Sequence, residues 1–321
     1  MLRYIIKRVL VAIPLLLAMS LLTFALMQLT PGNYFDSLKL NPQISPETIA
    51  RYEKLYHLDR PLLEQYFHWV KNLFRFELGY SFFYNVPVGN LMAGRLWNTF
   101  ILSLTSLIFT WMIAIPLGIW AAVNRNRFTD RILSVISFIG LSVPSFFLAM
   151  VFLYWVSQWG ILPLGGMRSA SYDDLNALGK IADMGRHLVI PTLVISLGSM
   201  AGLQRIMRGN MLEVLRQQYI LTARAKGLPE HKVIYRHALR NAINPLITLF
   251  GYELSGLLGG AALTEIICSW PGIGSLMLTA VRAKDVYLVM ASMLMGGILL
   301  LIGNLIADIL LAYSDPRIRY D

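Results

Sequence analysis

Histidines, cysteines and phosphate-binding glycine loops are the residues most able to do chemistry, and none occurs here in a catalytic pattern. The single cysteine, Cys268, can form no disulfide within the chain. No Gly-x-x-x-x-Gly-Lys-Ser/Thr loop occurs, so the chain is not expected to bind ATP itself. The histidines show no metal-ligand spacing; they are His57, His68, His187, His231 and His237. The sequence therefore predicts no enzyme activity, no metal and no cofactor on this chain.

The most informative segment is Gln204–Asn244, which holds eight basic residues and two acidic ones. Its helix-like stretch Gln217–Lys226 ends at Gly227, a residue typical of helix C-terminal caps. Pro229 can then open a second helix. A turn of a few residues would have served as a connector, so about 40 structured residues indicate another role. The alternatives are a contact surface for a partner and a surface helix bound to anionic lipid head groups.

Two acids and a pair of glycines stand inside apolar stretches. A buried charge in lipid is costly and usually faces a cavity or a partner, so Glu253 either lines a translocation path or forms a structural pair. Asp308 is expected to pair with a basic residue at the cytoplasmic face. Gly256 and Gly260 form a Gly-x-x-x-Gly pattern, which permits close helix contact within this chain or with a neighbouring one.

The elements that must position these residues are membrane spans. The chain has 321 residues, of which 56% are hydrophobic and only 14% charged, against roughly 25% in soluble domains. A spanning helix needs about 20 mostly apolar residues. Six stretches qualify: Val9–Thr30, Thr99–Val123, Ile132–Val156, Leu188–Leu203, Pro245–Leu263 and Val286–Leu311. The fourth is expected to continue as helix through Arg205 and Arg208, whose long side chains can snorkel.

The distribution of charge sets the expected orientation. With a cytoplasmic N-terminus, 16 Lys and Arg residues lie inside and 12 outside, and net charge is +11 inside against +1 outside. This asymmetry explains the overall charge of +10 better than nucleic-acid binding does. The first apolar run has 22 residues, longer than the 7–15 of a signal core, so an uncleaved first span is favoured over a cleaved signal. Both termini are then cytoplasmic.

The outside loop Pro31–Asn98 is too long for a mere connector. Ser45-Pro46-Glu47 and Asp59-Arg60-Pro61 both have the pattern of helix starts. Aromatic residues interleaved with Lys71 and Arg75 suit a membrane interface. The loop is either a solvated cap that packs on the helices or a docking surface for an external partner.

Several motifs together resemble one family. The run Thr222-Ala223-Arg224-Ala225-Lys226-Gly227-Leu228, followed by His237-Ala238-Leu239-Arg240-Asn241-Ala242 and Pro245, resembles the cytoplasmic signature of permeases in peptide and nickel ABC importers. Further matching stretches run from one end of the chain to the other: Leu29-Thr30-Pro31-Gly32, Leu78-Gly79-Tyr80-Ser81, Glu265, Ser269-Trp270-Pro271-Gly272-Ile273-Gly274, Asn304, Asp308 and Asp315-Pro316-Arg317. The glutamate that opens the general motif is missing, because Leu221-Thr222-Ala223 stands there.

The resemblance implies an all-α membrane protein of the type I ABC importer permease fold. It implies pairing with a second homologous permease, two cytoplasmic ATPases that carry ATP and magnesium, and an extracytoplasmic solute-binding protein. The loop around Gly227 would be the coupling helix that sits in an ATPase groove. The expected division is residues 1–98, the first span with its extracytoplasmic loop; 99–313, the transmembrane core with coupling loop 204–244; and 314–321, a cytoplasmic tail.

Two other classes of bacterial inner-membrane protein are alternatives to the importer. A gradient-driven secondary transporter predicts paired repeats with broken helices in matching positions, which are not seen. A scaffold or channel without an energised cycle is the third class. Neither explains the long cytoplasmic turn. The solute stays open among dipeptides, longer peptides, glutathione, nickel chelates and related sugars, because selectivity in the resembled family rests largely with the binding protein.

Overall fold

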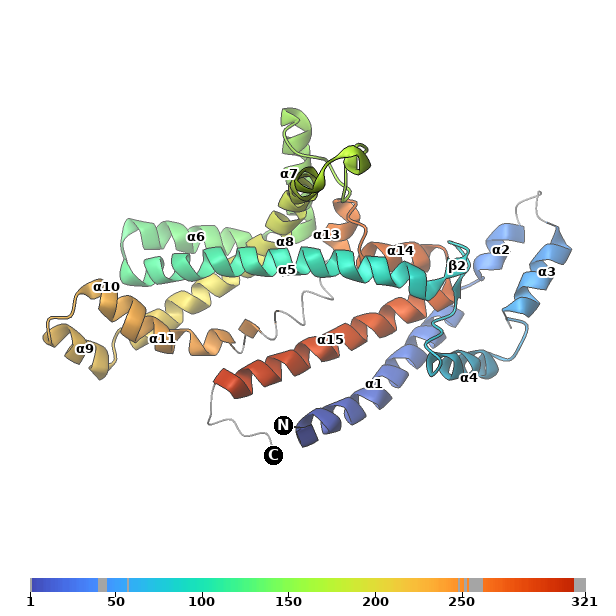
Figure 1. Cartoon of the computed structure of the whole chain (residues 1–321), viewed down its shortest axis with the longest axis horizontal. Helices are drawn as coiled ribbons and strands as arrows, with labels where there is room; N and C mark the ends of the chain where they lie inside the picture. Colours follow the sequence, from blue (N-terminus) through green and yellow to red (C-terminus); the bar gives the residue numbers. More distant parts are fainter. Residues whose placement is uncertain are drawn as a thin grey trace. The chain divides into compact units, whose positions relative to one another are not determined.

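The computed structural model describes residues 2–39, 45–56, 58–247, 249–250, 253 and 262–314 (Figure 1). This part of the chain is almost entirely helical. The N-terminal elements are α1 (Leu2–Leu29), α2 (Tyr34–Lys39), α3 (Pro46–Leu55), α4 (Leu62–Leu73), β1 (Tyr80–Ser81) and β2 (Val86–Pro87). The central elements are α5 (Val88–Val123), α6 (Phe128–Ser142), α7 (Ser145–Trp159), η1 (Tyr172–Asp174) and α8 (Ala177–Val214). The C-terminal elements are α9 (Gln218–Ala225), α10 (Glu230–Lys232), η2 (Val233–Ala238), α11 (Leu239–Ala242), α13 (Ala262–Ile267), α14 (Ile273–Arg282) and α15 (Val286–Ser314).

Four segments of the described chain are long and apolar enough to cross a membrane: Tyr4–Asp36, Val88–Val123, Ala177–Val214 and Val286–Ile306. A fifth crossing is available if the bent pair α6 and α7 counts as one span. Most of the predicted span Pro245–Leu263 lies outside the described residues. The described helices therefore support a multi-pass membrane protein, and the number six stays a prediction.

The predicted span Ile132–Val156 differs from expectation, because it is two helices that meet at an angle of 103°. Val143, the residue before Pro144, is extended with φ −90° and ψ 123°. A proline disfavours helical backbone at the preceding residue and offers no N–H of its own, so helix α6 ends there and α7 starts afresh. Pro14, Pro116 and Pro191, in contrast, are accommodated inside continuous helices.

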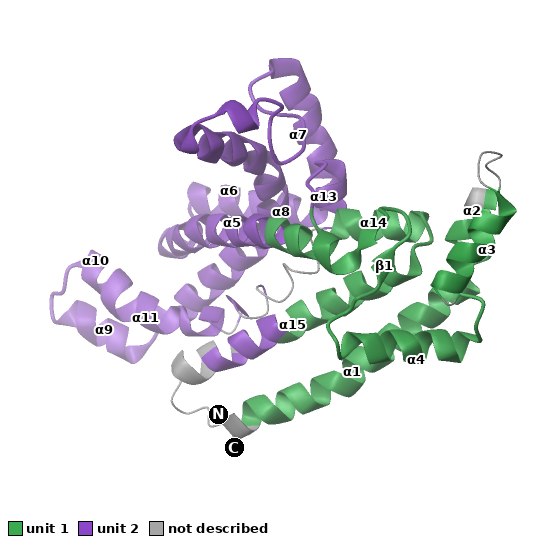
Figure 2. Cartoon of the chain, turned by 45° about the vertical axis from the view of Figure 1, so that its right-hand side comes forward, with its two compact units in different colours: residues 1–98, 272–301 green, residues 99–271, 302–321 purple. Residues whose placement is uncertain are grey.

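Contacts divide the chain into two compact units, coloured separately in Figure 2. Unit 1 consists of residues 1–98 and 272–301, and unit 2 consists of residues 99–271 and 302–321. Helix α5 contributes its first residues to unit 1 and the rest to unit 2, and helix α15 is shared in the same way.

In unit 1, helices α1 and α4 pack with the N-terminal part of α15. Phe24, Tyr66 and Met290 lie in their shared core. Helix α3 begins at Pro46, with the Ser45 side chain accepting a hydrogen bond from the Thr48 N–H, as the sequence predicts. Helix α4 begins at Leu62 with Pro61 in the cap position and no side-chain cap, so Asp59 does not have the predicted capping role.

In unit 2, helices α6 and α7 both pack against α8. Helix α8 is continuous for 38 residues and ends at Val214, which confirms the predicted extension of the fourth span beyond Arg205 and Arg208. The unit's largest core joins α8, part of α5 and the segment that follows α8. Gly118 of α5 lies so close to α8 that a Cβ there would stand 2.7 Å from the Met207 Cβ. One continuous helix therefore supports both the apolar core and the basic segment beyond it.

Candidate functional site

The segment that follows α8 is a compact turn of short helices, which we call the basic hairpin (residues 217–243) (Figure 1). Helix α9 ends as predicted. Gly227 has φ +74° in the left-handed region, its N–H donates to the Arg224 carbonyl at 2.9 Å, and the Leu228 N–H donates to the Ala223 carbonyl at 3.3 Å. These bonds use carbonyls that the end of a helix leaves unpaired. Glycine is needed for its backbone freedom alone, because a Cβ on Gly227 would meet open space.

The hairpin returns through helix α10, which follows Pro229, and a six-residue π-helical segment, η2. Proline opens this helix as predicted, because its missing N–H needs no partner in the first turn. Segments of π-helix are rare and often occur at functional sites. The predicted helix, sharp turn and second helix are therefore all present in the structure.

One face of α9 is buried against the returning helical arm of the hairpin and against α8. Ile220 is fully buried and Ala223 is 7% exposed, and both belong to a core that includes Val233 and Met207. The small side chain of Ala223 therefore lets α9 lie close to the chain's own core.

Polar contacts hold the hairpin in shape. The Arg224 Nη2 donates to Glu230 Oε1 at 2.6 Å across the turn. The Asn241 side chain donates to the Tyr219 hydroxyl at 2.7 Å, and the Asn210 side chain of α8 donates to the Ala242 carbonyl at 3.2 Å. Since these bonds join both arms of the hairpin to each other and to α8, the hairpin and the long helix form one stiff body.

The structure brings the seven predicted coupling residues into one turn, but not onto one face. Ala223 faces inward and the Arg224 charge is paired with Glu230. The exposed residues are Thr222, Arg224, Ala225, Lys226 and Gly227, and Leu228 is half-buried. Among the described residues Lys226 has no ion-pair partner, so its charge is available at the tip of the turn.

The predicted path residues are only partly described. The Trp111 Nε1–H of α5 donates to Glu253 Oε2 at 2.8 Å, and the Trp111 ring meets Phe250 edge to face with centroids 5.1 Å apart. Gly256 and Gly260 lie outside the described residues. The hydrogen-bond partner of Glu253 is therefore a neutral donor. This contact is compatible with both interpretations, a carboxylate positioned along a translocation path and a structural pair.

A second acid, Glu265 of α13, is 1% exposed and accepts a hydrogen bond from Thr99 Oγ1 at 2.6 Å. The Trp270 N–H donates to the Glu265 carbonyl at 2.7 Å, and the Trp270 side chain is fully buried. The bond from Thr99 ties α13 to α5 within unit 2. Sequence reasoning singled out Glu265 only as part of a resemblance, and its polar partner 166 residues away could not be inferred from spacing.

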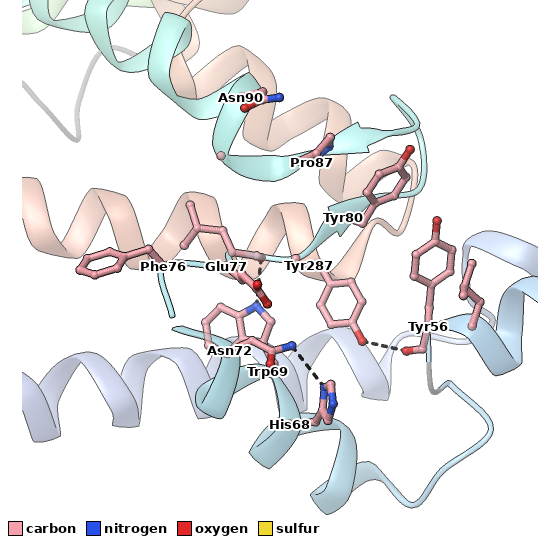
Figure 3. Close-up of a pocket in the computed structure, with 14 residues that line it drawn as sticks. Tyr56, His68, Trp69, Asn72, Phe76, Glu77, Tyr80, Pro87, Asn90 and Tyr287 are labelled. Atoms are coloured by element: carbon pink, nitrogen blue, oxygen red, sulfur yellow. Dashed lines mark hydrogen bonds between the residues drawn. The ribbon is translucent and has the colours of Figure 1, made fainter. Parts of the chain in front are cut away.

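Unit 1 contains a cavity of about 460 Å³ between α4, the β1–β2 hairpin and the start of α15 (Figure 3). Aromatic rings form much of its wall: Tyr56, Trp69, Phe76, Tyr80 and Tyr287. The Trp69 indole N–H donates to the Leu78 carbonyl at 3.2 Å and the Tyr287 hydroxyl donates to the Tyr56 carbonyl at 3.1 Å. The cavity is thus a braced aromatic pocket built largely from the segment between the first two spans.

Two buried ion and hydrogen-bond clusters were missed by sequence reasoning. Arg208, expected to snorkel, instead pairs with Asp130 through two bonds of 2.6 and 2.8 Å. Asp285 is fully buried and accepts from Ser81 Oγ at 2.6 Å. The available signal was an acid at the start of an apolar helix, where the helix dipole favours a carboxylate. Asp285 precedes α15 and caps it through the Leu288 N–H, whereas Asp130 in the first turn of α6 accepts from the Asn126 N–H instead.

No group of three or more His, Cys, Asp and Glu side chains suited to a metal ion occurs among the residues that the structure describes.

Comparison with known proteins gives a consistent result over the whole length. Residues 114–320 match the family described as binding-protein-dependent transport system inner membrane component, and residues 1–105 match that family's N-terminal region. The chain is 39% identical over 319 residues to the oligopeptide transport system permease protein AppB of Bacillus subtilis, with 99% of each chain covered. It is 34% identical over 337 residues to the dipeptide transport system permease protein DppB of Escherichia coli K12, covering 100% of this chain and 99% of that one.

A solved structure supports the fold. The chain is similar to a chain of the inward-facing MetNI methionine ABC transporter, with a TM-score of 0.50 and 18% identity over 68% of this chain and 96% of the other. That likeness concerns the fold alone, and it is the fold of an ABC importer permease. The family match favours the binding-protein-dependent importer over a gradient-driven transporter. The chain belongs to the family of inner membrane components of binding-protein-dependent transport systems.

Proposed function

We propose that the chain is one of two permease subunits of an ATP-driven importer that moves peptides, or a related small solute, into the bacterial cytoplasm. The names of the two relatives, an oligopeptide and a dipeptide permease, support the peptide class. The proposed topology has six spans of the type I importer arrangement, with both termini in the cytoplasm and the segment between the first two spans outside. The charge asymmetry of +11 against +1 supports this orientation.

The observation that carries the proposal is the basic hairpin on the end of α8. Its inner face is packed, its two arms are joined by hydrogen bonds, and its tip exposes Ala225 and Lys226. Because α8 is continuous for 38 residues, a push on the hairpin moves the transmembrane part of the same helix. A stiff lever of this kind can convert ATPase closure into a change of access.

The partners follow from this assignment. A second homologous permease completes the path, two ATPases bind the cytoplasmic face and carry ATP and magnesium, and a solute-binding protein docks outside. The braced aromatic pocket of unit 1 supports the docking role of the external segment over that of a plain cap, because aromatic pockets are common anchors in interfaces (Figure 3). Glu253, Gly256 and Gly260 are the proposed residues of the path.

The test uses the complex purified with its ATPases. Gly227→Val places a β-branched residue at positive φ and should distort the turn. Gly227→Asn is the matched control, because asparagine tolerates that conformation better. Ala225→Trp adds bulk at the exposed tip, and Ala225→Ser is its control. Subunit stoichiometry and ATPase activity are measured with and without loaded binding protein.

We expect Gly227→Val and Ala225→Trp to lose solute-stimulated ATP hydrolysis, and Ala225→Trp also to weaken ATPase attachment. Both variants should insert normally, because no span is altered. The controls should retain most of the stimulation. Normal attachment and stimulation in both bulky variants would show that the basic hairpin is not the coupling element.

A further inference from the structure

A small cavity of about 160 Å³ lies between α6 and α8 in unit 2. None of the residues that line it belongs to the basic hairpin or to the proposed path residues. Its lining combines serines, an amide, two arginines and two apolar side chains: Ser134, Ser137, Phe138, Leu141, Gln204, Arg205 and Arg208. This mixture is unusual for a helix pair with an apolar outer surface, so the cavity needs an occupant that is both anionic and apolar.

The amide of Gln204 points to a missing partner. The side chain is 3% exposed, and its Oε1 accepts a hydrogen bond from Ser137 Oγ at 2.6 Å. Its Nε2 is buried and has no hydrogen-bond partner among the described residues. Buried polar groups are nearly always paired, so this donor indicates a ligand acceptor in the cavity.

The two arginines supply positive charge on the same cavity. Arg205 is exposed and has no ion-pair partner within the described part of the chain. Arg208 donates through Nε and Nη2 to Asp130, and its Nη1 has no acceptor among the residues that the structure describes. With Asp130 counted, the cavity carries a net charge of +1, which favours an anion with oxygen acceptors.

The rim of the cavity is apolar on the side of α6. Phe138 is 58% exposed and Leu141 is 46% exposed, and Ile139 beside them is 58% exposed. In a membrane protein such side chains contact acyl chains. A free phosphate ion would gain nothing from this rim, whereas a phospholipid matches both halves of the site.

We propose that this cavity binds the phosphate group of an anionic phospholipid, with Gln204 Nε2 and Arg205 donating to phosphate oxygens and an acyl chain lying along α6. The proposal rests on the orientation given under the proposed function, which places this end of α6 and α8 at the cytoplasmic leaflet. The lipid would hold α6 against α8 beside the Arg208–Asp130 pair.

The experiment measures lipids retained by the intact complex. The complex, purified with its partner subunits, is reconstituted in phosphatidylcholine vesicles containing a minor share of phosphatidylglycerol, then extracted gently and examined by native mass spectrometry. The variants are Arg205→Gln and Gln204→Leu. The matched control is Arg131→Gln, which removes an equal charge from an exposed position of α6 that does not line the cavity.

Wild type and Arg131→Gln should retain phosphatidylglycerol over phosphatidylcholine. Each cavity variant should lose about tenfold of that preference, the value of one charge-assisted hydrogen bond. Arg205→Lys should restore part of it. Thermal unfolding of each variant shows whether the fold is kept. Normal solute-stimulated ATPase activity shows that the proposed coupling is kept, so a loss of lipid preference can then be assigned to the cavity.

Equal retention in wild type, Arg205→Gln and Gln204→Leu would overturn the proposal. A parallel arm adds excess inorganic phosphate during extraction. If phosphate abolishes the preference for phosphatidylglycerol and also binds the complex in lipid-free detergent, the site is assigned to the free ion instead. A further variant, Arg205→Cys, tests whether the second permease covers the cavity. Equal protection of this thiol from labelling with and without anionic lipid would show such cover and would also overturn the lipid assignment.

Discussion

The hydroxyl of Ser81 donates a 2.6 Å hydrogen bond to Asp285 Oδ2 across 204 residues of sequence. The same oxygen accepts from the Phe83 N–H at 3.1 Å, and the other carboxylate oxygen accepts from the Leu288 N–H at 3.3 Å. One buried carboxylate therefore both caps helix α15 and holds the β1–β2 hairpin. The β1–β2 segment of unit 1 is fastened to helix α15 by this group.

Removing that carboxylate should destabilise the protein strongly. Asp285→Ala leaves the Ser81 hydroxyl and two N–H groups buried without an acceptor, at a cost of about 3 kcal/mol. Ser81→Ala should cost about 1 kcal/mol, and the double variant should cost less than the sum because the two groups interact. The measurement is thermal unfolding of the purified complex. Ser142→Ala is the control, because this exposed serine donates only to the Phe138 carbonyl in its own helix.

The close approach of α5 and α8 gives a second prediction. Gly118→Ala puts a methyl group 2.7 Å from the Met207 Cβ and 2.9 Å from the Gln204 carbonyl oxygen, so the helices must separate. We expect a loss of about 1–3 kcal/mol in the free energy of unfolding. Gly94→Ala in the same helix has open space and should be neutral or stabilising by up to about 1 kcal/mol. Equal melting temperatures for the two variants would contradict this packing.

The hydrogen bond between Trp111 and Glu253 offers a way to decide whether Glu253 lines the path or has a structural role. If Glu253 lines the path, Glu253→Gln should alter transport while assembly and ATP binding stay intact, because glutamine keeps an oxygen acceptor for the indole N–H. Trp111→Phe removes that donor and tests whether the position of the carboxylate matters. Transport of labelled peptide into vesicles and subunit stoichiometry are the two measurements. Failure of Glu253→Gln to assemble would instead make the residue structural.

The proposed topology can be tested by thiol labelling in intact cells. Burial raises the pKa of the Cys268 thiol to about 11, and its side chain is 2% exposed, so the native cysteine should not react at neutral pH. Tyr52→Cys and Tyr172→Cys should react with an impermeant maleimide applied outside, and His231→Cys should react only after the membrane is opened. Labelling of His231→Cys from outside would rule out the proposed orientation.

The sequence predicted helix starts and turns well, because these features depend on neighbouring residues. Ser45 before Pro46 marked the start of α3, and Gly227 followed by Pro229 marked the turn of the basic hairpin, because caps and turns depend on the residues present there. The break at Val143 was missed because a proline within an apolar run is also compatible with a continuous span, and three other prolines are accommodated in that way.

The tertiary pairings could not be predicted, because they join positions far apart in sequence. Nothing near Arg208 indicates that its partner is Asp130, and nothing near Asp285 indicates Ser81. The inward placement of Ala223 depends on which face of a short helix meets the core, and an eight-residue helix with apolar residues on several sides leaves that choice open. The candidate site was thus located by sequence, while the roles within it required the structure.

Unit 1 is assembled from the two ends of the chain, residues 1–98 and 272–301, and this has a consequence for biosynthesis. At about 5–20 residues per second, a ribosome needs roughly 10–40 seconds to reach Asp285 after Ser81 has been made. Throughout that interval the β1–β2 hairpin lacks the carboxylate that fastens it. A nascent chain therefore carries an unfastened β1–β2 hairpin until the start of α15 has been made.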